Sequence, residues 1–305
     1  MKQAFKWSAV GLGCLVIIVG ITAVVLYSIG RSRLNQTYSV DVAAAPNDNN
    51  PETLERGKHL VEAVVACGEC HGEGLRGRAF FDDPAIGTVV SANLTGGEGG
   101  IADTYSDEDW IRAVRHGIDP AGKPLLVMPA QRFQNMSTAD LGAVLAYLKT
   151  VPPVDNVPSD TELTPLTYIL IALGQFDDSI PAETINHDAS LSVAPPEGAT
   201  QAYGEYLVSV ATCRDCHGKE LASGQAGPGE PIGPNLTPSG ELGRWTQSDF
   251  FQLMRTGQTP AGRQIQEFMP WRYYGKMTDT ELAAIWLYLQ SLESVQTPVN
   301  LGSGE

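Results

Sequence analysis

Two pentapeptides in this sequence combine residue types that can attach and ligate a haem. Residues 67–71 (CGECH) and 213–217 (CRDCH) both have the form C-x-x-C-H. Two thiols three positions apart can form thioethers to the two vinyl groups of one haem, and the His that follows is placed to ligate its iron. The sequence therefore predicts two covalently bound haem c groups, attached through Cys67, Cys70, Cys213 and Cys216 and ligated by His71 and His217.

A C-x-x-C pair has two other common uses, as half of a zinc site or as a thioredoxin-like redox pair. Neither use requires a His directly after the second Cys in both copies. A tetrahedral zinc site built from the two distant pairs would also leave both His residues unexplained. We therefore favour haem attachment and keep zinc binding and thiol redox chemistry as alternatives.

A second ligand for each iron is predicted downstream of each motif. Met128 and Met269, each followed by Pro, lie in loops from which a thioether could approach iron from the face opposite His. Met136 and Met277 are rival candidates, but each precedes a helix N-cap and is expected to pack as a hydrophobic staple. Met254 is expected in a helix core. We predict His/Met coordination by the pairs His71 with Met128 and His217 with Met269.

Coordination by two His residues is the main rival for either haem. The remaining candidates are His59, His116 and His187, and no second His recurs at one position of both halves. We expect these three at the surface or at helix ends. His/Met coordination raises the reduction potential relative to two His ligands and leaves no open site for a substrate. The pattern thus favours electron transfer over catalysis.

The landmarks around the two motifs recur in the same order, which indicates a duplicated domain. Helical spacing predicts a helix before each motif (52–66 and 201–212) and a last helix in each half (137–149 and 278–292). Between them, N-cap residues open a middle helix that ends near a Gly in both halves. The predicted capping pairs are Ser106 with Asp109, Thr246 with Asp249, Ser137 with Asp140, and Thr278 with Glu281.

Both halves also carry an Asn-Leu-Thr segment, at residues 93–95 and 235–237. In a secreted eukaryotic protein these segments would be candidate glycosylation sites. In a chain with haem-attachment motifs we favour a polar loop beside the haem edge.

Taken together, the first helix, C-x-x-C-H, Asn-Leu-Thr loop, capped middle helix, Met-Pro loop and last helix resemble class I cytochrome c domains. The whole chain is similar to membrane-associated dihaem cytochromes c, and each half resembles cytochrome subunits that accept electrons from membrane dehydrogenases. It has two haem motifs where the alcohol and gluconate dehydrogenase subunits carry three. The resemblance implies a mainly α fold with two tandem domains, at residues 51–154 and 200–298.

The N-terminal segment predicts a membrane anchor. Residues 7–30 carry no charge, and as a helix they would be about 36 Å long, enough to cross a bilayer core. The alternative is a signal peptide cleaved near Ala43–Ala45, but the apolar run is longer than a signal core. Cys14 lies inside this run, where an apolar role is favoured over lipidation. Residues 31–50 are expected to be a linker.

The side of the membrane is predicted from the haem chemistry. Lys2 and Lys6 on one flank balance Arg31 and Arg33 on the other, so the positive-inside rule does not decide the orientation. In the cytochromes that this chain resembles, haem is attached outside the bacterial cytoplasm. We expect an inner-membrane protein with its N-terminus inside and its haem domains in the periplasm. The net charge of -15 argues against a nucleic-acid partner.

The connector at residues 155–199 contains an apolar run, 166–176, that is far too short to span a membrane. It is expected either to pack in the cleft between the domains or to dock on a membrane partner or the bilayer surface.

Three functions are compatible with these features. The favoured one is a membrane-tethered electron carrier, not itself an enzyme, that passes single electrons between a quinol-oxidising or dehydrogenase complex and a soluble cytochrome or terminal oxidase. The second is a fixed cytochrome c subunit of a larger membrane complex. The third is a dihaem enzyme, such as a peroxidase or thiosulfate dehydrogenase, with one iron open to substrate.

Overall fold

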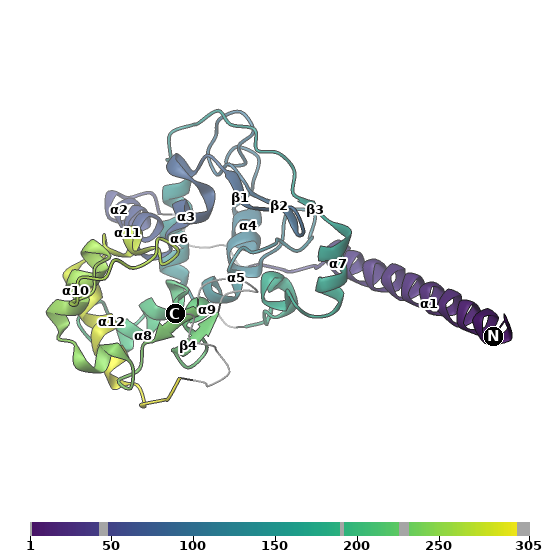
Figure 1. Cartoon of the computed structure of the whole chain (residues 1–305). Helices are drawn as coiled ribbons and strands as arrows, with labels where there is room; N and C mark the ends of the chain where they lie inside the picture. Colours follow the sequence, from purple (N-terminus) through teal and green to yellow (C-terminus); the bar gives the residue numbers. More distant parts are fainter. Residues whose placement is uncertain (1, 43–47, 190–191, 226–231, 298–305) are drawn as a thin grey trace.

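The computed structural model describes residues 2–42, 48–189, 192–225 and 232–297. Helix α1 (Lys2–Asn35) projects as a single rod from the folded body, with the N-terminus at its far end (Figure 1). From Lys6 onward α1 is long and apolar enough to cross a membrane, and its most apolar stretch is not covered by the rest of the chain. The cleavage position considered at residues 43–45 lies outside the described residues.

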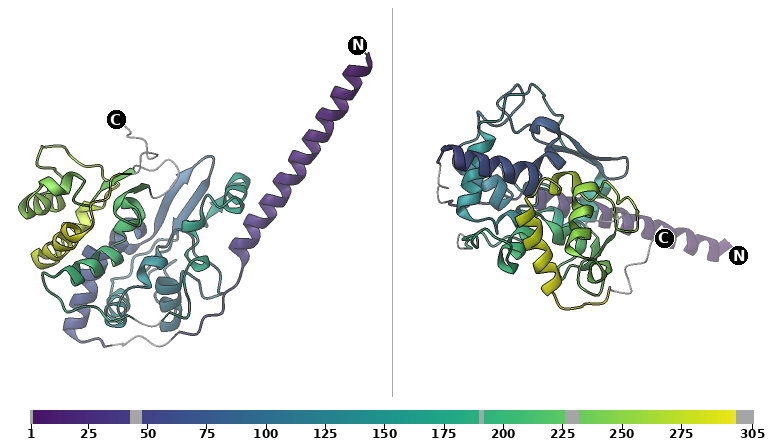
Figure 2. Two further views of the ribbon diagram at one scale, coloured as in Figure 1. Left: turned by 90° about the horizontal axis from the view of Figure 1, so that it is seen from below. Right: turned by 90° about the vertical axis from the view of Figure 1, so that its left-hand side faces the viewer.

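Two lobes follow and lie against each other (Figure 2). The elements of the first lobe are α2 (Pro51–His59), η1 (Leu60–Val64), α3 (Cys67–His71), η2 (Glu73–Leu75), β1 (Arg78–Asp83), β2 (Gly87–Ser91), α4 (Asp107–Ile111), η3 (Arg112–His116), α5 (Ala130–Phe133) and α6 (Thr138–Leu148). Those of the second lobe are α8 (Gln201–Val210), α9 (Cys213–His217), β4 (Ala222–Gln225), β5 (Ile232–Asn235), η6 (Glu241–Arg244), α10 (Gln247–Thr256), α11 (Trp271–Tyr274) and α12 (Asp279–Ser291). The connector contributes β3 (Glu162–Leu163), α7 (Pro165–Ala172), η4 (Asp177–Ser179) and η5 (Pro181–Glu183).

The first and last helices of each lobe cross at a glycine. A Cβ at Gly57 of α2 would lie 1.9 Å from the Ala143 carbonyl oxygen of α6, and one at Gly204 of α8 would lie 2.0 Å from that of Ala284 in α12. Only a residue without a side chain allows the two backbones to approach this closely. The predicted first and last helices of both halves are therefore confirmed, and they form the same crossing in each lobe.

The first lobe contains one more residue than the second between this glycine and its first motif cysteine, Cys67 against Cys213. Helix α2 accommodates the extra residue by continuing as the π-helical turn η1, whereas α8 remains α-helical. Single π turns of this kind absorb an insertion without breaking the helix, and they occur frequently near functional sites.

The predicted middle helices are confirmed together with their caps. Ser106 and Thr246 each form a full capping box with the acid three residues later. The helices end at Gly117 (φ 64°) and Gly257 (φ 69°), in the left-handed conformation that glycine adopts without strain.

One predicted pair, Ser137 with Asp140, forms the N-cap hydrogen bond but not the full capping box. The Ser137 hydroxyl accepts a hydrogen bond from the Asp140 backbone N–H at 3.0 Å. The Asp140 carboxylate does not accept the reciprocal hydrogen bond from the Ser137 N–H. That N–H donates instead to the Tyr206 hydroxyl of the second lobe at 3.1 Å. The carboxylate is held by Arg56 and Tyr206. Contacts between the lobes have thus replaced half of the local box.

Two β-hairpins were not predicted. Strands β1 and β2 pair antiparallel, β3 of the connector extends them into a three-stranded sheet, and β4 pairs with β5 in the second lobe. The hairpin strands are short and lie between each motif and the Asn that opens its Asn-Leu-Thr segment, with β5 ending at Asn235 itself.

The apolar connector packs against the anchor instead of the cleft between the lobes. The ring of Tyr168 in α7 meets Tyr27 of α1 edge to face at a centroid distance of 5.2 Å. A Cβ at Gly30 would lie 1.8 Å from the Tyr168 carbonyl oxygen. Arg33 of α1 forms ion pairs with Asp177 and Glu183 farther along the connector. The folded body is therefore joined to α1 by packing as well as by the polypeptide chain.

The two lobes meet through a pair of matching polar clusters. Asp140 of α6 accepts hydrogen bonds from Arg56 of its own lobe (2.9 Å) and from Tyr206 of the other lobe (2.6 Å).

In the second cluster Glu281 of α12 takes the place of Asp140. Its carboxylate bonds His59 of the first lobe at 2.7 Å and lies 3.5 Å from the Tyr203 hydroxyl of its own lobe. The lobes are thus related by an approximate two-fold arrangement, and His59 is an interface residue instead of a free surface His.

Candidate haem sites

Both C-x-x-C-H motifs form one short helix with the same unusual backbone on either side. Ala66 and Thr212, directly before the first Cys, have positive φ angles of 54° and 57°. Gly72 and Gly218, directly after the His, have φ angles of 75° and 80°. The repeated left-handed residues turn the chain sharply at both ends of α3 and α9, so the two motifs present their side chains in the same way.

The motif thiols are strongly perturbed. No disulfide links the motif cysteines, all of which lie among the described residues. Burial, with a smaller contribution from the neighbouring thiol, raises the pKa of Cys67 to about 12 and that of Cys213 to about 12. A thioredoxin-like pair needs a thiolate stabilised at low pKa, and here the opposite holds. In the described residues no three His, Cys, Asp or Glu side chains gather as a metal site, so the two pairs do not form a shared zinc site.

The motif imidazoles are oriented by backbone carbonyls. His71 Nδ1 lies 2.8 Å from the Ala92 carbonyl oxygen, and His217 Nδ1 lies 2.8 Å from that of Pro234. A carbonyl only accepts, so Nδ1 carries the proton and Nε2 carries the lone pair of the neutral ring. Burial lowers the pKa of both rings and the carbonyl bond opposes this. A metal-binding His is typically held this way, so both residues fit a haem iron.

The predicted Met ligands occupy equivalent loops. Met128 and Met269 are half-buried beside the core cluster that Cys67 and Cys213 also border. Each is followed by a Pro with φ -77° and ψ 49° that stands directly before α5 or α11.

The rival Met residues lie elsewhere. Met136, Met277 and Met254 are 0%, 1% and 5% exposed and belong to the hydrophobic core. Their burial agrees with the staple and core roles predicted for them. They are packed as core side chains, whereas Met128 and Met269 are held at its edge.

Two buried indole groups add to the fit. The Nε1–H groups of Trp110 in α4 and Trp271 in α11 are buried and have no hydrogen-bond acceptor among the described residues. Buried donors are almost always paired in folded proteins. The carboxylates of a haem would supply acceptors of the kind that these two donors lack.

The Asn side chains of the Asn-Leu-Thr segments hydrogen-bond to distant parts of the backbone. Asn93 and Asn235 are 0% and 8% exposed, which does not fit glycosylation. The Asn93 amide donates to the Val154 carbonyl at 2.8 Å, and Asn235 donates to that of Val295 at 2.7 Å. Each segment ties the loop after the motif to the chain that follows the last helix of its lobe.

The short helix after each Met loop carries a side chain that contacts the motif of the other lobe. Arg132 Nε of α5 lies 2.5 Å from Asp215 Oδ1 in the second motif. The Tyr273 hydroxyl of α11 would lie 2.9 Å from a Cβ at Gly68 in the first motif. Burial raises the pKa of Asp215, and Arg132 opposes this rise. Neither contact was predicted, because both join residues far apart in the chain.

The two other His residues form a pair. His116 is buried, and its Nδ1 lies 3.0 Å from His187 Nδ1. Burial, followed by the charges of His187 and two arginines, lowers the pKa of His116 to about 4. Neither residue belongs to a motif, and the pair was not predicted.

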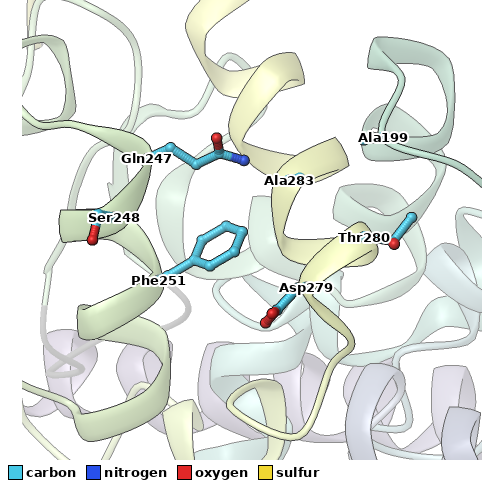
Figure 3. A pocket seen from close by; sticks show the side chains of 7 residues that line it. All are labelled: Ala199, Gln247, Ser248, Phe251, Asp279, Thr280 and Ala283. Carbon is cyan, nitrogen blue, oxygen red and sulfur yellow. The ribbon is translucent and has the colours of Figure 1, made fainter.

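A surface hollow of about 460 Å³ lies on the second lobe between the starts of α10 and α12. The side chain of Phe251 points into it (Figure 3). Its lining consists of Ala199, Gln247, Ser248, Phe251, Asp279, Thr280 and Ala283. None of these is a Cys, His or Met, so the hollow is separate from the predicted ligands.

Comparison with known proteins matches each lobe to a family. Residues 52–148 match the family described as cytochrome c oxidase, cbb3-type, subunit III, and residues 201–293 match the family cytochrome c.

Over nearly the whole chain the similarity is to subunits of bacterial dehydrogenases. The chain is 28% identical to the fructose dehydrogenase cytochrome subunit of Gluconobacter japonicus, over 85% of this chain and 58% of that protein. It is 28% identical to the cytochrome c subunit of the quinone alcohol dehydrogenase of Gluconobacter oxydans, over 86% of this chain and 59% of that protein. It is 30% identical to the gluconate 2-dehydrogenase cytochrome c subunit of Pantoea cypripedii, over 82% of this chain and 62% of that protein. The chain thus spans less than two thirds of the length of these curated relatives.

Proposed function

The chain carries two cytochrome c domains behind an apolar N-terminal helix, and from this premise we propose that it is a membrane-tethered dihaem protein that transfers single electrons. Two such domains imply two covalently bound haem c groups. When bound, each haem supplies a one-electron iron couple. The chain's own residues attach, orient and enclose these groups.

The site residues are assigned in parallel in the two domains. Cys67 and Cys70 attach the first haem, with His71 and Met128 as iron ligands. In the second domain the attachment residues are Cys213 and Cys216 and the ligands are His217 and Met269. The observation that carries this assignment is the pair of motif imidazoles, which both donate from Nδ1 to a carbonyl and so leave Nε2 for iron.

The division of the chain follows from these assignments. We place the anchor at residues 7–30, the linker at 31–50, the first domain at 51–154, the connector at 155–199 and the second domain at 200–298. The chain belongs in the bacterial inner membrane, with the N-terminus in the cytoplasm and both domains in the periplasm, because c-type haem is attached on that side.

The electron donor is proposed to be a membrane-associated dehydrogenase or quinol-oxidising complex, and the acceptor a downstream cytochrome or terminal oxidase. A fixed cytochrome subunit of a dehydrogenase is the second candidate. It is favoured by the relatives, three of which carry the name of a dehydrogenase cytochrome subunit.

The experiment has two readouts. Full-length protein made in a host competent for cytochrome maturation should hold two covalent haems, and its oxidised form should show the full sulfur-to-iron charge-transfer band for two Met ligands. A colourless protein, zinc in place of haem, or half the band strength would refute the site assignment. Native gel electrophoresis of detergent-solubilised membranes then separates the candidates. Co-migration with a dehydrogenase catalytic subunit supports the fixed subunit, and separate migration supports the carrier.

A further inference from the structure

One ion pair crosses from the first lobe into the motif of the second. Arg132 Nε lies 2.5 Å from Asp215 Oδ1, and Asp215 stands between Cys213 and Cys216. The two side chains are only 24% and 25% exposed, so solvent and salt screen their charges less than at an open surface. A cation of the first lobe is therefore part of the immediate surroundings of the second haem site.

The reverse contact carries no charge. Tyr273 stands at the same distance after Met269 as Arg132 stands after Met128. Its hydroxyl reaches the first motif at Gly68, but a phenol is neutral at physiological pH. The two lobes make the same packing contact with different electrostatics.

The first motif has a cation from its own lobe. Arg78 of β1 donates to the backbone carbonyls of Glu69 (2.5 Å) and Cys70 (3.4 Å). The second motif contains Arg214, but this side chain donates to Tyr288 of α12 at 2.6 Å. The carboxylate of Asp215 is instead neutralised by Arg132 from across the interface. The charge balance of the second site thus depends on the first lobe.

We propose that Arg132 is a positioning residue of the first lobe that raises the reduction potential of the haem held by Cys213 and Cys216. The inference rests on the proposed function, since it requires that haem to be bound. Oxidised iron carries one more positive charge than reduced iron, so a carboxylate without its partner favours the oxidised form. By cancelling the charge of Asp215, Arg132 favours the reduced form and contributes to the order of the two potentials.

The test compares Arg132→Gln with its matched control Tyr273→Phe in the full-length, two-haem protein. Both are placed in a Met128→His background, which moves the first haem to lower potential so that the second titrates alone. Arg132→Gln should shift the equilibrium between reduced and oxidised iron of the second haem toward the oxidised form by roughly three- to tenfold. A shift of this size is expected from the loss of one partly screened charge at an effective dielectric constant of about 20. Tyr273→Phe should leave it unchanged.

Two further variants separate charge from packing. Arg132→Lys keeps the charge and should restore most of the wild-type potential. Asp215→Asn removes the carboxylate and leaves the guanidinium, so it should shift the second haem in the opposite direction. An unchanged potential in Arg132→Gln, or an equal shift of both haems in the wild-type background, would overturn the inference. Haem content below two, or a missing charge-transfer band in the wild type, would refute the proposed function instead.

Discussion

At the scale of single residues, the two haem sites are built from a small set of side chains placed by backbone geometry. His71 and His217 are held by backbone carbonyls at 2.8 Å, and the left-handed residues before and after each motif fix the ends of its helix. A backbone acceptor therefore orients each ring. The proposed Met ligands, by contrast, lie on loops, and their assignment rests on their equivalent positions and partial exposure.

Replacing one Met ligand should change the potential of one haem alone. Met128→His or Met269→His is expected to lower that potential by on the order of 0.1 V, within the range of about 0.8 V that axial ligands span. Covalent attachment should persist, because the thioethers and the motif His are untouched. Redox titration followed by haem absorbance measures the potential, and retention of haem on the denatured polypeptide measures covalent attachment. Met136→Leu, a change in the fully buried core, is the control, and an unchanged potential in either His variant would remove that Met from the coordination sphere.

Glu281 at the interface should make stability depend on acid. Burial raises the pKa of this carboxyl. The hydrogen bonds with His59 and Thr278 and the charges of His59 and Arg56 lower the pKa by more, so that it lies below its ordinary value of 4.5. A depressed pKa in the folded state means that ionised Glu281 stabilises the fold above about pH 4.5 and that this contribution is lost as the pH falls further.

The measurement is the melting temperature of the haem-loaded protein between about pH 6 and pH 3, the window in which such a carboxylate takes up its proton. Glu281→Gln should lose less stability on acidification than the wild type. Asp279→Asn, in an exposed ion pair with Arg255, is the control and should behave like the wild type, because such pairs contribute about 0–1 kcal/mol. Equal acid sensitivity in all three proteins would contradict this role of Glu281.

At the scale of elements, each lobe depends on one close helix crossing. The backbones of α2 and α6, and of α8 and α12, meet where Gly57 and Gly204 leave no side chain between them. These crossings also carry the acids of the lobe interface, since Asp140 and Glu281 lie in the first turns of α6 and α12. Packing within each lobe therefore places the residues that join the lobes.

Gly57→Ala and Gly204→Ala should each lower the free energy of unfolding by about 1–3 kcal/mol, because the added Cβ would force the helices apart. Gly198→Ala is the control, since its Cβ would meet only the Thr200 methyl at 3.9 Å, and it should change stability by less than about 0.5 kcal/mol. Chemical denaturation monitored by haem absorbance gives these values. Full stability in both helix variants would show that the crossing adapts without cost.

At the scale of the whole molecule, we expect α7 to set the height of the body above the membrane. A bilayer core takes about 20 helical residues, so a span that begins at residue 7 ends near Tyr27, which contacts Tyr168 of α7. Helix α7 is then expected at the boundary between lipid and water. Its exposed leucines, Leu166 (45%) and Leu173 (54%), suit that position better than open solvent.

A nitroxide label tests this placement. In a Cys14→Ser background, a label at Leu173→Cys should be accessible to oxygen and shielded from a water-soluble relaxation agent when the protein is in lipid vesicles. The same label at Arg263→Cys, a site that is 60% exposed on the second lobe, should show the reverse. Equal access of the aqueous agent to both labels would place α7 away from the lipid.

The sequence by itself determined the features that depend on residues close together in the chain. The C-x-x-C-H motifs, the capped helices at Ser106 and Thr246, the Met loops and the apolar anchor are short-range patterns, and each could be predicted because attachment, capping and helical periodicity act between residues close in the chain. The ligand assignments also come from such patterns.

The tertiary structure decided what depends on contacts between distant residues. The Asp140 carboxylate does not complete the predicted capping box, because it accepts hydrogen bonds from Arg56 and Tyr206 instead. The apolar connector lies on the anchor, and Arg132 reaches the second motif. A sequence pattern does not encode which of several polar or apolar partners will be near in space, because the free energy of such contacts arises only when the two lobes and the anchor pack together.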